Sequence, residues 1–151
     1  MRGDLDFEKS LRERVKLLAG LDVAAFDAVY DAIVLTPGAK TLVRILRRLG
    51  YRFALVSGGF SQITDRLAAD LGIHFSRANQ LEVVDGKLTG RIVGDVVDRA
   101  GKARALREFA AELGLTEASV IAIGDGANDL DMLNAAGLGI CLLYTSDAAD
   151  E

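Results

Sequence analysis

Two short apolar runs that end in glycine-rich turns constrain the fold of this chain more than any other feature. Residues 53–56 lead into the sequence SGG at 57–59, and residues 120–123 lead into GDG at 124–126. Each run follows an amphipathic helical pattern and has the length of a buried strand. Helices that alternate with buried strands are typical of parallel sheets built from right-handed strand-helix-strand units. The sequence therefore predicts an α/β fold, a parallel sheet with helices on both faces, and a turn at 57–59.

Apolar periodicity places the other elements. Helical spacing of apolar side chains predicts helices over residues 7–18, 23–33, 36–49, 63–71, 106–113 and 133–136. Thr36 and Pro37 form a good N-cap and first-turn pair for the third of these helices. Asp85-Gly86 favours a tight turn and predicts a β-hairpin over residues 81–93, and residues 138–143 are expected to form a final strand.

The first two predicted helices are consecutive, amphipathic and joined by a short connection. Such a pair is typical of a helical hairpin. We therefore expect residues 1–34 to form a helical unit of their own. Residues 35–143 would form the α/β domain, and residues 144–151 a polar tail.

The composition disfavours several classes of protein. Of the 151 residues, 50% are hydrophobic and 26% are charged, as in soluble globular domains. The net charge is -4 and the basic residues are scattered along the chain, which disfavours a nucleic-acid partner. No apolar run approaches the roughly 20 residues that span a bilayer, and the N-terminus has no signal-peptide core. We expect a cytoplasmic protein with no membrane partner; a homo-oligomer is compatible with the sequence, which does not fix the oligomeric state.

The sequence GDGAND at 124–129 is the strongest chemical motif. It places Asp125 at the tip of a predicted strand and Asp129 four residues later, where a helix begins. Two carboxylates in such a place suit Mg²⁺, which takes oxygen ligands from carboxylates, water and phosphate. Both residues are alternatively structural, because aspartate is common in turns and at helix N-termini. A dinucleotide-binding fingerprint is disfavoured, because Asp129 occupies the third glycine position and would repel a pyrophosphate.

Ser57 and Lys102 are candidate phosphate ligands. Ser57 follows a predicted strand, so its hydroxyl and the N–H groups of Gly58 and Gly59 could hold an anionic oxygen. Lys102 lies near the start of a predicted helix, where a cation opposes the helix dipole and a bound anion would offset that repulsion. The alternatives are an ordinary turn at Ser57 and a solvated side chain at Lys102.

Taken together, these motifs resemble those of the phosphoserine phosphatases, a family of the haloacid dehalogenase superfamily. SGGF at 57–60, then Lys102, then GDGAND at 124–129 occur in the order and at the spacing seen in that family. The resemblance reaches to about Ile140. It also includes Met1-Arg2-Gly3, Phe7, Ser10-Leu11-Arg12, Arg14-Val15 and DGKLTG at 85–90.

The resemblance implies a Rossmann-like core and a helical cap. Residues 1–34 would be part of the cap, and residues 35–143 would be the core without its first strand. The resemblance also implies roles for the matching residues. Arg14 would hold the substrate carboxylate, Ser57 and Gly58 would bind the phosphoryl group, and Lys102 would neutralise its charge. Asp125 would coordinate Mg²⁺, Asn128 would contact substrate or phosphate, and Asp129 would orient the site or support Lys102.

The implied reaction is the Mg²⁺-dependent hydrolysis of O-phospho-L-serine to L-serine and phosphate, in serine biosynthesis, through a phosphorylated aspartate. In that family the nucleophile and the general acid belong to a D-x-D-x-T motif on the first core strand, and this sequence has no such motif. Asp4 and Asp6 have the D-x-D spacing, but a predicted helix starts directly after them, at Phe7, so we expect them to be helix N-terminal acids. We therefore expect this chain to be an incomplete, inactive fragment with a non-native tail at 144–151.

Two other functions are compatible with the sequence. The first is a phosphatase of the same superfamily that acts on another small phosphomonoester, because cap residues set the specificity. The second is a non-catalytic phosphate-binding fragment, because the D-x-D-x-T motif is missing.

Overall fold

The computed structural model describes residues 2–142, with side chains from Phe7 onward. The chain divides into two compact units, with the boundary between Val97 and Asp98, and each unit is described by itself. The predicted boundaries of cap and core stay predictions, and the predicted tail at 144–151 lies outside the described residues. Within the described part of the chain, no helix combines the length and the hydropathy needed to cross a bilayer.

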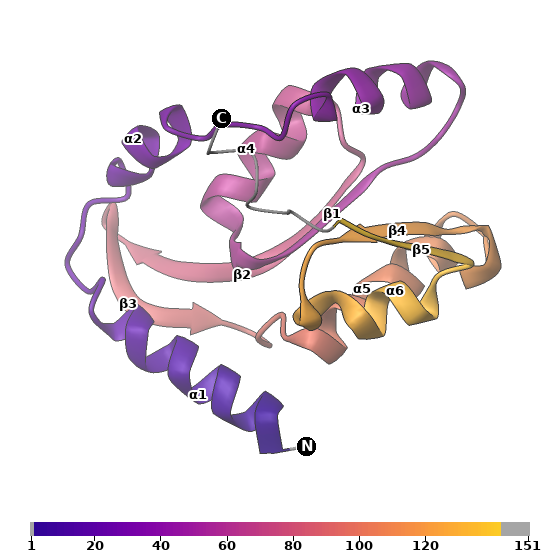
Figure 1. Ribbon diagram of the computed structural model, residues 1–151. Coiled ribbons are helices and arrows are strands. Elements are labelled where there is room, and N and C mark those ends of the chain that lie inside the picture. Colours follow the sequence, from indigo (N-terminus) through magenta and orange to yellow (C-terminus); the bar gives the residue numbers. More distant parts are fainter. Residues whose placement is uncertain (1, 143–151) are drawn as a thin grey trace, which may run out of the picture. The chain divides into compact units, whose positions relative to one another are not determined.

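The first unit contains a three-stranded sheet with helices packed against it (Figure 1). Its elements are α1 (Arg2–Lys16), α2 (Ala25–Asp31), α3 (Ala39–Arg48), β1 (Ala54–Phe60), α4 (Ser61–Leu71), β2 (Phe75–Val84) and β3 (Lys87–Val93). The strand order is β1-β2-β3, with β1 parallel to β2 and β2 antiparallel to β3. The connection from β1 through α4 to β2 is the predicted strand-helix-strand unit.

The β2–β3 hairpin confirms the prediction made from Asp85-Gly86. Val84 pairs with Lys87 across the turn. The two turn residues have φ angles of 49° and 74°, as the tight primed turns of hairpins require.

The core of the first unit lies between α1 and the hairpin. Leu11 and Val15, four residues apart on one face of α1, pack with a cluster of buried side chains. That cluster comprises Leu81, Leu88, Ile92 and Val96. α1 packs on β3 and α2 packs on α4, so the predicted hairpin of the first two helices is wrong. The apolar stripe of α1 finds a sheet face instead of a second helix.

Two predicted boundaries also differ from the structure. α3 begins at Ala39, and its N-cap is Gly38 with φ 86°, so Thr36 does not cap the helix. The chain does not turn at 57–59 but continues in β1 as far as Phe60. Pairing with β2 is irregular between Val56 and Phe60, so the glycines interrupt the ladder without ending the strand.

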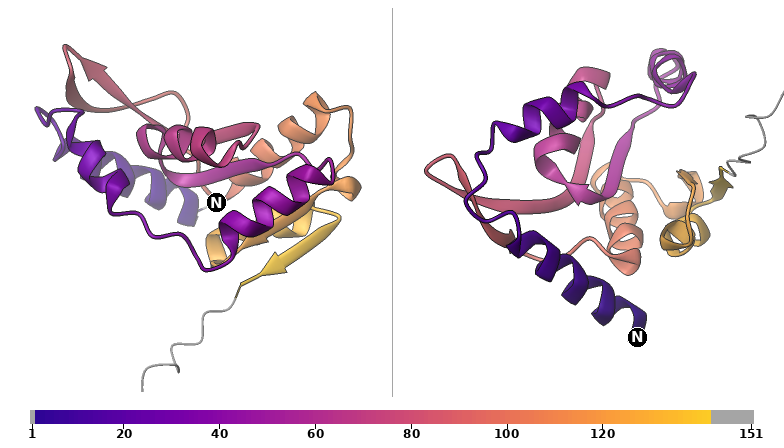
Figure 2. Two further views of the ribbon diagram at one scale, coloured as in Figure 1. Left: turned by 90° about the horizontal axis from the view of Figure 1, so that it is seen from above. Right: turned by 60° about the vertical axis from the view of Figure 1, so that its left-hand side comes forward.

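The second unit pairs two parallel strands with two helices (Figure 2). Its elements are α5 (Arg99–Glu112), the 3-10 turn η1 (Glu117–Ser119), β4 (Ile121–Gly124), the 3-10 turn η2 (Ala127–Asp129), α6 (Leu130–Ala135) and β5 (Leu138–Cys141). Leu106 and Phe109 of α5 and Leu133 of α6 are buried. The parallel pairs β1–β2 and β4–β5, each joined through a helix, confirm the predicted α/β class.

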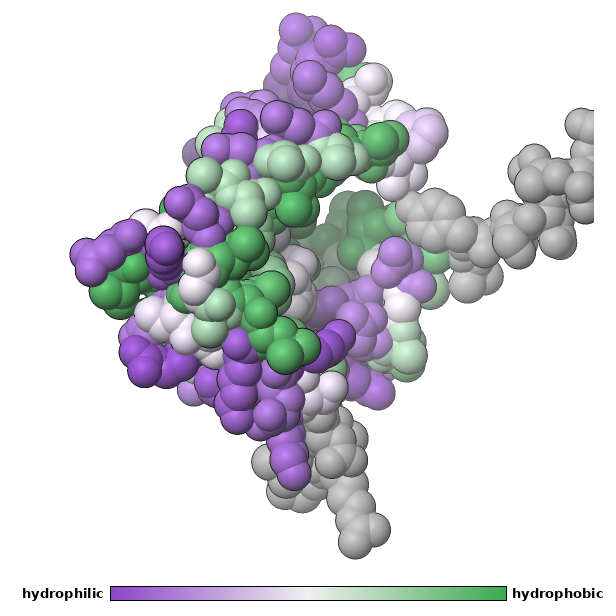
Figure 3. Space-filling model, turned by 90° about the vertical axis from the view of Figure 1, so that its left-hand side faces the viewer, coloured by the Kyte–Doolittle hydropathy of each residue, from purple (hydrophilic) through white to green (hydrophobic). Residues whose placement is uncertain are grey.

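Large apolar side chains remain exposed on the two-stranded sheet. Ile121 pairs with Leu138, and Ile123 pairs with Ile140. Between 37% and 53% of each of these side chains is exposed. Burial on this sheet is therefore incomplete among the described residues. Figure 3 shows a face of the first unit, where hydrophobic residues also lie at the surface beside hydrophilic ones.

Candidate functional site

A buried ion pair joins α5 to η2. Nζ of Lys102 lies 2.7 Å from Oδ1 of Asp129, and each side chain is only 8% exposed. A lysine this far from water requires a partner, because an isolated buried charge costs several kcal/mol. Asp129 supplies that partner, so Lys102 is not the solvated lysine of the simplest interpretation.

The start of α5 sets the position of Lys102. Asp98 is the N-cap residue, and its Oδ1 accepts a hydrogen bond from the backbone N–H of Gly101 at 2.6 Å. The backbone N–H of Lys102 donates to the Asp98 carbonyl at 3.0 Å. The cap fixes where the helix begins and therefore fixes the position of the Lys102 side chain in the first turn.

The second oxygen of Asp129 organises the glycine-rich turn after β4. Oδ2 accepts hydrogen bonds from the backbone N–H groups of Asp125, at 3.1 Å, and Gly126, at 3.3 Å. One carboxylate therefore binds the lysine with one oxygen and the turn with the other. Gly124 is required for this approach, because a Cβ there would lie 2.6 Å from the Asp129 Cβ.

The charge of Asp129 follows from these contacts. Burial alone raises the pKa of Asp129, but the hydrogen bond and charge of Lys102, with the two backbone N–H groups, outweigh it and hold the pKa below its ordinary value. Hydrogen bonds and an opposite charge favour the ionised form of a carboxyl group. Asp129 is therefore an anion at neutral pH, and its oxygens are already occupied.

Asp125 differs from Asp129 in having an uncommitted carboxylate. It follows β4 directly, its side chain is exposed, and within residues 2–142 that side chain makes no hydrogen bond or ion pair. The described residues contain no group of three or more histidine, cysteine or acidic side chains that could hold a metal by themselves. Mg²⁺ typically takes only one or two carboxylates and completes its shell with water and phosphate oxygens. Asp125 fits one such ligand.

Asn128 lies over the same turn. Its side chain is exposed, and its Oδ1 occupies the space beside Gly126, where a Cβ would lie only 2.5 Å away. The side-chain amide thus borders the turn that carries Asp125.

The other predicted site residues belong to the first unit. The Ser57 Oγ accepts a hydrogen bond from the Gly59 N–H at 3.0 Å, so that N–H is occupied and the serine hydroxyl proton can point elsewhere. Arg14 is exposed on α1, and its Nε donates to the Ser10 carbonyl at 3.3 Å.

Gly58 is held by a residue that sequence reasoning missed. Asn79 of β2 is completely buried. Its Nδ2 donates to the Gly58 carbonyl at 2.8 Å, and its Oδ1 accepts from the Val97 N–H at 2.7 Å. Asn79 therefore fixes the backbone next to Ser57. An asparagine within a strand, where this residue type is disfavoured, was the available signal.

The structure thus brings Lys102, Asp125, Asn128 and Asp129 together within the second unit. Arg14, Ser57 and Gly58 lie in the first unit. The expectation that both sets form one site stays a prediction.

The chain matches the haloacid dehalogenase-like hydrolase family over residues 1–134. It is 63% identical to a phosphoserine phosphatase of Streptomyces coelicolor over 140 residues, which cover 93% of this chain and 34% of that protein. The chain therefore spans about a third of that relative's length.

Solved structures agree with the sequence comparison. The structure of a probable phosphoserine phosphatase from Vibrio cholerae superposes with a TM-score of 0.87 at 40% identity, covering 93% of this chain and 44% of the other. A phospho-aspartyl intermediate analogue of phosphoserine phosphatase gives a TM-score of 0.82 at 40% identity, covering 93% of this chain and 68% of the other. The relatives described above are named phosphoserine phosphatases, and the chain belongs to the haloacid dehalogenase-like hydrolase family.

Proposed function

We propose that this chain supplies substrate-binding and metal-binding residues of a Mg²⁺-dependent phosphoserine phosphatase. The observation that carries the proposal is the turn after β4, where the exposed carboxylate of Asp125 stands beside the buried Lys102–Asp129 pair. A cation at a fixed position and a free carboxylate are the groups that phosphoryl transfer needs around the phosphate.

Lys102 can serve the phosphate while it is paired. An ammonium group has three N–H donors, and one of them is used by Asp129. The other two can donate to phosphoryl oxygens and offset the charge that develops on them. Asp129 would act as a positioning residue that holds the ammonium group in place through this hydrogen bond.

Asp125 would hold the metal. When bound, Mg²⁺ supplies a fixed positive charge that polarises the phosphoryl oxygens. The carboxylate of Asp125 provides one ligand, and its backbone N–H is anchored on Asp129, so the metal ligand and the phosphate-binding lysine share one support.

Ser57 and Arg14 would complete the recognition of phosphoserine. The Ser57 hydroxyl would donate to the phosphate, next to the Gly58 backbone that Asn79 holds. Arg14 of α1 is exposed, and its Nη groups remain available to bind the substrate carboxylate through two parallel hydrogen bonds. The attacking aspartate would come from a D-x-D-x-T segment, which this sequence does not contain.

The test joins an N-terminal segment carrying D-x-D-x-T to this chain and measures phosphate release from O-phosphoserine. Release should require Mg²⁺ and should fall about 100-fold or more in Asp125→Ala, because a metal ligand is lost. The control is Asp131→Ala, which removes an equally acidic side chain that pairs with Arg99 outside the proposed site. Unchanged turnover in Asp125→Ala would contradict the metal role.

The substrate proposal has a separate test. O-phosphoethanolamine lacks the carboxylate of phosphoserine, so the ratio of kcat/KM for the two substrates reports the Arg14 contact. Arg14→Ala should remove most of the preference for phosphoserine, whereas Lys9→Ala on the same helix should keep it. An equal preference in Arg14→Ala and the parent chain would assign the carboxylate to another residue.

A further inference from the structure

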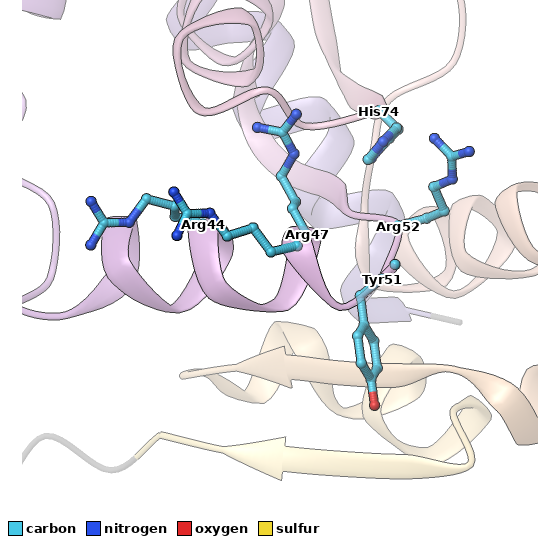
Figure 4. Close-up of a pocket in the computed structure, with 7 residues that line it drawn as sticks. Arg44, Arg47, Tyr51, Arg52 and His74 are labelled. Carbon is cyan, nitrogen blue, oxygen red and sulfur yellow. The ribbon is translucent and has the colours of Figure 1, made fainter.

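A strongly basic cavity lies in the first unit, and none of the residues that line it is assigned to the reaction. Its volume is about 450 Å³, and it is lined by Arg44, Arg47, Arg48, Gly50, Tyr51, Arg52 and His74 (Figure 4). No carboxylate lines it. Four arginines around one hollow stand out in a chain whose net charge is -4.

The fold gathers these residues from three segments. Arg44, Arg47 and Arg48 lie three and four positions apart on α3 and therefore face the same way. Gly50, with φ 91°, then turns the chain into β1, and Arg52 precedes that strand. His74 immediately precedes β2 and lies near Arg52, because Ala54 of β1 pairs with Phe75 of β2.

Hydrogen bonds hold two of the lining side chains, Arg47 and His74, in place. The Nη1 of Arg47 donates to the Leu71 carbonyl at 3.1 Å, and its guanidinium fills the space beside Gly72, where a Cβ would overlap it. The ring of His74 is fixed by the Phe53 N–H, which donates to Nδ1 at 3.2 Å. Nδ1 is thus the acceptor, so Nε2 carries the proton and is free to donate.

The remaining cations have no counter-charge in the structure. Arg44, Arg48 and Arg52 make no ion pair within residues 2–142. Like charges at the spacing of Arg44 and Arg48 destabilise a helix. Burial, Arg52 and Arg47 all lower the pKa of His74, which agrees with a positive potential at this place. A bound anion would remove the repulsion.

We propose that this cavity binds a small molecule that carries two or more phosphate groups. Guanidinium groups form paired hydrogen bonds with phosphate oxygens, and four of them line the cavity. Cavities of about 300 to 1,000 Å³ accommodate whole small molecules, so a single inorganic phosphate would leave most of the arginines without a partner. A compact polyphosphate matches both the charge and the volume.

The only histidine of the chain provides a direct measurement. The test follows the His74 imidazole resonances by NMR during titration of the full chain with inorganic phosphate, pyrophosphate or tripolyphosphate. Saturable shifts should appear with pyrophosphate and tripolyphosphate, at concentrations about tenfold or more below those needed for inorganic phosphate, because more guanidinium groups are engaged.

Matched variants separate a built site from general charge. The double variant Arg44→Gln, Arg52→Gln removes two lining arginines that have no hydrogen bond to lose and should weaken pyrophosphate binding about tenfold or more. Arg104→Gln, Arg107→Gln removes the same charge from α5 and should leave the titration unchanged. Weakening to the same extent in both double variants would overturn the proposal.

Two other results would also overturn it. One is the absence of saturable His74 shifts with tripolyphosphate. The other is shifts produced by a single-stranded oligonucleotide but not by tripolyphosphate, which would assign the basic residues to a nucleic-acid surface. The assay needs neither Mg²⁺ nor turnover, so its outcome is independent of the proposed phosphatase activity.

Discussion

The Lys102 ammonium donates to Asp129 Oδ1 at 2.7 Å, and the other oxygen of the same carboxylate accepts the Asp125 N–H. One side chain therefore links a cation on α5 to the backbone of the turn after β4. Loss of either partner would leave a buried charge without compensation.

Lys102→Met should destabilise the chain by about 3 kcal/mol or more, because a buried carboxylate would lose its cation. The matched control is Arg99→Met. Arg99 pairs with Asp131, and the two side chains are 42% and 41% exposed. That variant should change the free energy of unfolding by about 1 kcal/mol or less. Urea denaturation followed by circular dichroism measures both values, and similar losses in the two variants would contradict the structural role of the buried pair.

The same pair predicts how stability responds to acid. The pKa of Asp129 is held below its ordinary value of 3.8 by Lys102 and two backbone N–H groups, despite burial. A depressed carboxyl pKa contributes stability above the unfolded pKa, and that contribution is lost as the pH falls through the folded pKa. The stability difference between the parent chain and Asp129→Asn should thus stay constant from neutral pH down to about 4 and shrink below it. A difference that shrinks already between neutral pH and about 5 would contradict the depressed pKa.

Asn79→Leu should cost about 2 to 4 kcal/mol, because the Gly58 carbonyl and the Val97 N–H would both lose their partners in a buried place. Asn79→Asp tests the direction of the amide, since it keeps an acceptor for Val97 but places a carboxylate against the Gly58 carbonyl. Asn134→Leu, which replaces an exposed residue of α6, is the control. Thermal unfolding of the three variants measures the effect. Equal melting temperatures for Asn79→Leu and Asn134→Leu would contradict a stabilising role for the two hydrogen bonds of Asn79.

Asp98→Ala should destabilise α5 by about 1 kcal/mol, because the Gly101 N–H loses its cap. Asp95→Ala, three residues earlier and exposed, removes the same charge without a capping bond. Urea midpoints distinguish them. Restoration by Asp98→Ser, a second good N-cap residue, would show that the hydrogen bond and not the charge is responsible.

Element type followed from the sequence, because periodic apolar residues decide which face is buried. The 85–86 turn was predicted from its Asp-Gly dipeptide, and the strand before Asp125 was predicted from its apolar run. The sequence did not predict which element packs against each apolar face, since an apolar stripe fits a helix or a sheet equally well. α1 was expected to pack on a helix and packs on β3 instead.

Contacts between distant residues were only partly predictable. The link between Asp129 and Lys102 came from family resemblance, and Asn79 was missed because a single polar residue in a strand does not reveal its partners. The basic cavity was missed because Arg52 and His74 are separated along the chain and meet only when β1 pairs with β2. The pairing of parallel strands therefore brings together basic residues that are scattered along the sequence.

A larger residue at position 124 cannot stand beside Asp129. The aspartate occupies the volume that any larger side chain at position 124 would need. A redesign that moves this turn into another protein must therefore carry Gly124 along with the aspartate, because the aspartate beside a larger residue at that position leaves a collision.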